Sequence, residues 1–134
     1  MSSRFKDWNR KRAIHSYCFI NEMSKEIGEG NEDERAKLLS ICRKLPMQIK
    51  ENGIIRVLAY YSNVSNEEGK EKIEKRVGMT LEKWIKEELL SQEDEEVKEV
   101  IKDLATYSFS KYCFINKEVM EYAIWLKRNA EGML

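Results

Sequence analysis

The sequence predicts an all-α fold, a compact single-domain bundle of about five to seven helices over residues 1–134. Apolar side chains recur at helical spacing along most of the chain. One proline and six glycines are too few for the regular turns of a sandwich or barrel. A chain of 134 residues fits one domain that closes its own core.

The first predicted helix covers Arg4–Ile27 and ends at Gly28, because glycine is favoured just past a helix end. Helical periodicity predicts two faces, one apolar and one polar. The apolar face consists of Ala13, Tyr17, Ile20, Met23 and Ile27, and the polar face of Arg4, Lys11 and His15.

Asn31, followed three residues later by Glu34, is a capping pair for a second helix. Its apolar stripe is Leu38, Cys42, Leu45 and Ile49. Pro46 lies inside this stripe and predicts a kink or restart, because proline removes an amide donor. Asn52-Gly53 then ends the segment.

Ile54–Tyr61 is apolar on nearly all sides and predicts a short helix in the middle of the core. The polar segment Ser62–Lys70 predicts a surface loop. A short helix is expected over Glu71–Val77, and Thr80 is expected to cap another. The stripe of that second helix is Leu81, Trp84, Ile85 and Leu89.

Ser91 is expected to cap an acidic helix that turns Val97, Val100, Ile101 and Leu104 inward. The last helix is expected to begin after Asn116. It should bury Val119, Ala123, Leu126 and Ala130.

The 24 basic and 24 acidic residues cancel, so attraction of the whole molecule to a polyanion would be weak and any such site must be local. The charge is segregated. Residues 4–15 carry five cations and one anion, a net of +4, and residues 92–103 carry six anions and two cations, a net of −4. Such asymmetry suits contacts between unlike neighbours, and it also suits ordinary solvated helix faces.

Cys18, Cys42 and Cys113 are odd in number and lack CxxC spacing, which fits a reducing cytoplasm rather than a disulfide framework. We expect neither export nor membrane insertion, because no apolar run reaches the length of a span.

His15 with the cysteines is a weak metal set, and isolated cysteines are usually small core residues. The sequence therefore predicts no enzyme, no metal, no cofactor and no small-molecule substrate.

Basic residues offer a different kind of chemistry. Two blocks, residues 41–61 and 117–131, each set an apolar helical stripe beside cations. If the surfaces converge, they form a groove that neutralises successive phosphates without reading bases. The candidates are Arg43, Lys44, Lys50, Lys111, Lys127 and Arg128. Each taken singly also suits a solvated helix position.

The blocks RKLPMQIKENGIIRVLAYY (43–61) and MEYAIWLKRNAE (120–131) resemble the small α-helical subunit of type III-B CRISPR effector complexes, the RNA-targeting Cmr complex. The resemblance carries Arg43, Lys44, Lys127 and Arg128 over as RNA-facing residues. Leu45, Pro46, Asn52, Gly53, Trp125 and Leu126 carry over as structural residues. Family members often have a basic residue after the tyrosine that precedes the last helix. Here Cys113 follows Tyr112, and Lys111 is a substitute.

The resemblance implies a non-catalytic subunit that stacks beside the backbone subunits and lines the channel for guide and target RNA. Its implied partners are the backbone and large subunits, neighbouring copies of itself, and guide and target RNA, with no membrane. A second interpretation stays open: a helical protein-interaction adapter that makes no direct contact with RNA.

Overall fold

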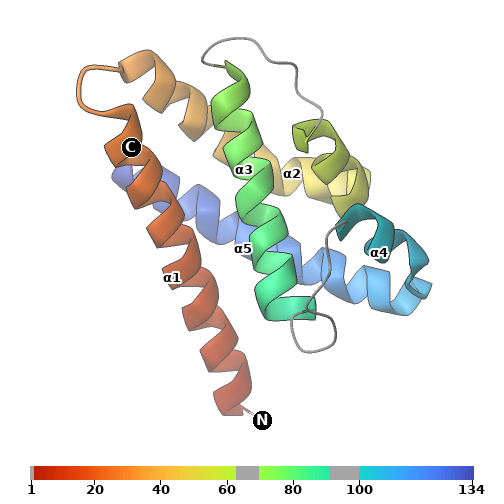
Figure 1. Ribbon diagram of the computed structural model, residues 1–134. Helices are drawn as coiled ribbons and strands as arrows, with labels where there is room; N and C mark the ends of the chain where they lie inside the picture. Colours follow the sequence, from red (N-terminus) through yellow and green to blue (C-terminus); the bar gives the residue numbers. More distant parts are fainter. Residues whose placement is uncertain (1, 63–69, 91–99) are drawn as a thin grey trace. The chain divides into compact units, whose positions relative to one another are not determined.

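The computed structural model describes residues 2–62, 70–90 and 100–134, and these residues form helices and no strand. The helices are α1 (Ser2–Ile27), α2 (Glu32–Ser62), α3 (Lys70–Trp84), the π-helix η1 (Ile85–Leu90), α4 (Val100–Thr106) and α5 (Phe109–Met133) (Figure 1). The all-α prediction is confirmed. The loop predicted over Ser62–Lys70 lies almost entirely, and the Ser91 cap with Val97 entirely, outside the described residues.

The chain divides into two compact units. Unit 1 joins Met1–Pro46 to Glu121–Leu134, and unit 2 is Met47–Met120. Helices α2 and α5 therefore contribute residues to both units. The single-domain organisation over residues 1–134 stays a prediction.

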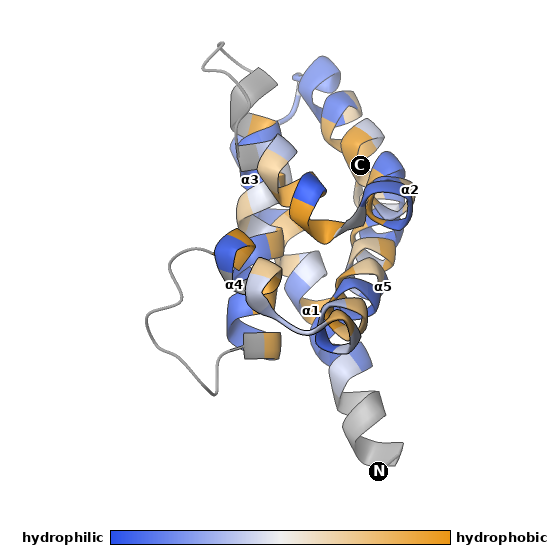
Figure 2. Ribbon diagram, turned by 90° about the vertical axis from the view of Figure 1, so that its right-hand side faces the viewer, coloured by the Kyte–Doolittle hydropathy of each residue, from blue (hydrophilic) through white to orange (hydrophobic). Residues whose placement is uncertain are grey.

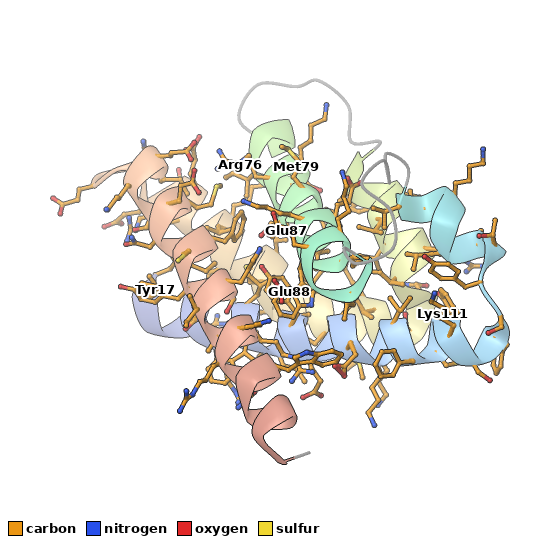
Figure 3. All side chains as sticks on the ribbon, turned by 60° about the horizontal axis from the view of Figure 1, so that its bottom comes forward. Tyr17, Arg76, Met79, Glu87, Glu88 and Lys111 are labelled. Carbon is orange, nitrogen blue, oxygen red and sulfur yellow. The ribbon has the colours of Figure 1, made fainter. Side chains whose placement is uncertain are left out.

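The core of unit 1 consists of apolar stripes from three helices (Figure 2). α1 contributes Phe19, Ile20, Met23 and Ile27; α2 contributes Leu38, Cys42 and Leu45; α5 contributes Tyr122, Ala123, Leu126 and Ala130. The predicted stripes of α2 and α5 are confirmed. Tyr17 was expected in the core and is instead 51% exposed, on the outer side of α1 (Figure 3). The buried face of α1 centres on Ser16 and Ile20, and Tyr17 lies about 100° around the helix from Ser16.

The turn between α1 and α2 follows the predicted glycine signal, but Asn31 acts differently from the prediction. Gly28 has a φ of 79° and its amide donates to the Ser24 carbonyl at 3.0 Å, which closes α1. Asn31 was expected to accept hydrogen bonds from α2 amides. Its Nδ2 instead donates to the Ile27 carbonyl at 2.7 Å, so it satisfies the end of α1.

In unit 2, α3 packs closely against α2. A Cβ added at Gly78 would lie 2.9 Å from the Cβ of Tyr61, so the two helices approach to a distance that only glycine permits. The predicted separation into a helix before Val77 and another capped by Thr80 is wrong. α3 runs through both segments, because the gain from packing outweighs the low helix propensity of Gly78. Thr80 is buried within the helix.

The interruption of α2 lies at Gly53 and not at Pro46. α2 continues through Pro46, whereas Gly53 has φ 81° and ψ 157°, outside the helical region. The restart leaves the Ile54 amide without a helical acceptor, and the Oδ1 of Asn116 accepts from it at 2.7 Å. The kink or restart predicted at Pro46 is therefore wrong in position. The Asn52-Gly53 signal marks the true interruption.

Asn116 lies inside α5, which begins at Phe109, well before the predicted start. Sequence reasoning placed Asn116 at the beginning of its own helix. The structure uses its side chain as a cap for the second part of α2. The buried apolar residues of unit 2 are Ile49, Ile54, Val57, Leu58, Tyr61, Ile73, Val77, Leu81, Trp84, Ile85, Val100, Leu104, Ile115 and Val119. Leu89 and Ile101, predicted to face inward, are only half-buried.

We expect Gly53→Ala to destabilise the protein by about 1–3 kcal/mol, because an L-residue is strained at these angles. The added Cβ would also lie 2.5 Å from the Oη of Tyr112, which must then move. The midpoint of urea-induced unfolding, followed by circular dichroism, measures the effect.

Gly132→Ala is the matched control, since its Cβ would meet nothing within 4 Å. Alanine also has the higher helix propensity, so this variant should unfold at an equal or higher urea concentration. Equal midpoints for Gly53→Ala and the unchanged protein would contradict the account of α2 given above.

Candidate RNA-facing surface

An ion pair joins the two basic blocks in unit 1. The Nε of Arg43 on α2 donates to the Oε2 of Glu131 on α5 at 3.1 Å. Glu131 follows Lys127 and Arg128 by four and three residues, one helical turn. Arg43 and Lys44 therefore lie beside the part of α5 that carries the other two candidate cations.

The four candidate cations of unit 1 differ in their exposure. Arg43, Lys44 and Arg128 are exposed, and Lys127 is half-buried. With Glu131 included, these five side chains carry four positive charges and one negative charge. We call this group the cationic surface of unit 1. At an exposed site a salt bridge contributes little to stability, so the Arg43–Glu131 pair orients the two side chains more than it stabilises the fold.

Arg128 has an aromatic neighbour on its own helix. Its Cζ lies 5.7 Å from the ring centroid of Trp125, which is within cation–π range. The indole Nε1 of Trp125 donates to the Oδ1 of Asn9 on α1 at 2.9 Å. Arg128 therefore lies between Trp125, three residues before it on the side of α1, and Glu131, three residues after it on the side of α2.

Other contacts hold α5 against α1 in the same unit. The Nδ2 of Asn129 donates to the Oγ of Ser16 at 2.7 Å, and Ser16 is fully buried. The Nδ1 of His15 and the hydroxyl of Tyr122 lie 2.6 Å apart. His15, predicted on the polar face of α1, thus takes part in packing between helices. Periodicity of apolar residues could not reveal that His15 and Ser16 belong to the packed face of α1, because both are polar and pair with polar groups of α5.

The remaining two candidates, Lys50 and Lys111, belong to unit 2. Lys50 is exposed on α2. Lys111 is half-buried near the start of α5 (Figure 3), and its Nζ lies 4.0 Å from the ring centroid of Tyr107. The convergence of these two lysines with the cationic surface of unit 1 stays a prediction.

Two residues of this region were missed by sequence reasoning. Asn9 was given no role, and Glu131 was quoted only as part of a motif. The signal for Glu131 was its position one turn after two cations, which predicts a local ion pair but not a partner on another helix. Nothing in the sequence around Asn9 indicates its distant partner, Trp125.

The described residues contain no group of three or more His, Cys, Asp or Glu side chains placed to hold a metal ion. Cys18 and Cys113 are exposed, and Cys42 is buried in the α2 stripe. Burial raises the pKa of the Cys42 thiol to about 12. Among the described helices, none combines the length and apolarity needed to cross a bilayer.

The fold and the site define a small all-α protein with a cationic surface built from two helices of unit 1. A family model described as "CRISPR-associated protein (Cas_Cmr5)" matches residues 8–133. The chain therefore belongs to this family of CRISPR-associated proteins, and the resemblance to the small helical subunit family is confirmed.

A solved structure gives the same fold. The chain is similar to the crystal structure of a CRISPR-associated Cmr5 family protein from Thermus thermophilus, with a TM-score of 0.66 and 22% identity. The match covers 95% of this chain and 96% of that chain. No curated protein matches the sequence.

The cysteines yield a test of the core. At pH 8 a maleimide should label Cys18 and Cys113 in the native protein, because both are exposed. Cys42 should stay unlabelled, since its pKa of about 12 keeps it protonated and burial denies access. Mass spectrometry should show two adducts in buffer and three in guanidinium chloride. Three adducts formed at one common rate in buffer would contradict the burial of Cys42.

Proposed function

We propose that this protein is a non-catalytic structural subunit of a type III-B CRISPR effector, an RNA-guided antiviral ribonucleoprotein of the cytoplasm. Copies of it stack beside the backbone subunits, contact the large subunit, and line the channel in which target RNA pairs with guide RNA. Membership of the Cas_Cmr5 family supports a place among the subunits of a CRISPR effector.

The observation that carries the RNA-lining role is the ion pair between Arg43 and Glu131. It brings the cations of α2 next to those of α5 on one unit, so that one strand can meet Arg43, Lys44, Lys127 and Arg128 together. Cations at exposed helix positions suit phosphate oxygens, and such contacts carry no sequence information. Specificity is then left to base pairing between guide and target.

Lys50 and Lys111 are the candidate RNA contacts of unit 2, where Lys50 is exposed and Lys111 is half-buried. The subunit as a whole is net neutral, so one copy alone offers few contacts. Several copies along one strand multiply these contacts, because each added copy binds a strand that is already held nearby.

The charge reversal Lys127→Glu with Arg128→Glu tests the RNA-lining role. In the reassembled complex it should weaken capture of target RNA by about tenfold or more. It should also reduce the magnitude of the negative slope of log K against log salt by about two. Filter binding of labelled target RNA at several salt concentrations measures both quantities.

The matched control is Lys83→Glu with Lys86→Glu, which changes the net charge equally at two exposed lysines of unit 2. It should leave capture within about twofold. Undiminished capture by a reassembled complex that contains the Lys127/Arg128 variant would favour the adapter without RNA contact. Ultraviolet crosslinking within the assembled particle separates the two functions as well, since RNA adducts on α2 or α5 support RNA lining.

Glu131→Gln tests the part that Arg43 has in RNA binding. The substitution removes the carboxylate that engages Arg43 and keeps the size of the side chain. Loss of an exposed ion pair should change the free energy of unfolding by no more than about 1 kcal/mol. Capture of target RNA should strengthen by about two- to fivefold, because one repulsive charge disappears from the path of the strand. Unchanged capture would show that the strand does not approach Arg43.

A further inference from the structure

We propose that Asn9 of α1 is a positioning residue for Arg128: it fixes the indole of Trp125, and the indole in turn orders the guanidinium that meets RNA. The inference rests on the RNA-lining role proposed above. It adds the first helix to a site that the sequence assigned only to α2 and α5.

The geometry is a relay of two contacts across unit 1. The Oδ1 of Asn9 accepts from the Nε1 of Trp125 at 2.9 Å, and the Trp125 ring lies 5.7 Å from the Cζ of Arg128. Asn9 is exposed, Trp125 is half-buried and Arg128 is exposed. The relay therefore leads outward from the α1–α5 contact to a cation in solvent.

The hydrogen bond from Trp125 is not what holds α1 and α5 together. Asn129 reaches the fully buried Ser16, and His15 reaches the fully buried Tyr122, both one to two turns further along α1. These contacts and the apolar stripe beneath them hold the helices. Removal of the Asn9 side chain should therefore leave the fold in place and release only the indole.

A released indole matters because arginine is flexible. Its side chain has several rotatable bonds, and holding it in one geometry for a phosphate costs conformational entropy. A fixed aromatic neighbour restricts the guanidinium before RNA arrives. On the other side, the nearest anion along α5 is Glu131, which is engaged by Arg43. The relay thus orders Arg128 toward an external anion and not toward a carboxylate of its own helix.

The first measurement needs no RNA. The isolated chain is labelled with ¹⁵N, and the indole signal of Trp125 is assigned by its absence from Trp125→Phe. Asn9→Ala should shift this indole signal and the Nε–H signal of Arg128, whereas Asn21→Ala on the same helix should shift neither. Asn9→Asp keeps the acceptor oxygen and should return the indole signal of Trp125 toward its original position in the spectrum. An unmoved Arg128 signal in Asn9→Ala overturns the relay.

The second measurement uses the reassembled complex and labelled target RNA. Asn9→Ala should weaken capture by about two- to fivefold, the ratio that corresponds to an exposed cation–π contact. In the background of Arg128→Ala the same substitution should have no further effect. An equal loss in both backgrounds means that Asn9 acts independently of Arg128 and overturns the proposal.

The two measurements separate this proposal from the function on which it rests. If Arg128→Ala alone leaves capture unchanged, the RNA role of Arg128 fails, and Asn9 then has no RNA-directed role. The signals of the isolated chain still decide whether the relay from Asn9 to Arg128 exists. If Arg128→Ala weakens capture while Asn9→Ala does not, the proposed function stands and the positioning role of Asn9 is rejected.

Discussion

The hydrogen bond from the Ile54 amide to Asn116 is the contact on which the arrangement of unit 2 depends. Gly53 departs from helical geometry, so the second part of α2 begins with amides that its own turn cannot satisfy. The side-chain carboxamide of Asn116 on α5 accepts the hydrogen bond from the Ile54 amide, and this contact fixes α5 next to the interruption at Gly53. The hydroxyl of Tyr61, which donates to Gln48 at 2.7 Å, ties the two parts of α2 across the same point. Gly78 then admits α3 close to Tyr61.

Unit 1 obtains its cationic surface from ordinary packing requirements. α5 buries Ala123, Leu126 and Ala130, so the intervening positions 124, 127, 128 and 131 fall toward its solvent side. Cys42 and Leu45 do the same for α2 and leave Arg43 and Lys44 outside. The apolar stripes bring the helices together, and the ion pair between Arg43 and Glu131 follows. The positions of the cations at the surface thus follow from which residues are buried in the core.

Periodicity predicted the helical class, the stripes of α2 and α5, and the end of α1 at Gly28, because each of these depends on local spacing. It failed where tertiary contacts decide. α2 continues through Pro46. α3 continues through Gly78, since close packing against Tyr61 outweighs the low helix propensity of glycine. Among the site residues, the convergence of the α2 and α5 cations was a hypothesis from the two basic blocks, and the resemblance added the RNA-facing role. The partners of Arg43 and Trp125 lie 88 and 116 residues away in the chain, and no local pattern can indicate them.

The cap that Asn116 supplies also links the motions of two helices. A cap located on a different helix lasts only while that helix stays wound. Partial opening of α5 at Asn116 would therefore expose the start of the second α2 segment to solvent, and the amide protons of both would exchange with deuterium as one cooperative unit. The segment from Ile54 to Tyr61 thus depends for its first amide on the integrity of a helix that begins much later in the sequence, at Phe109.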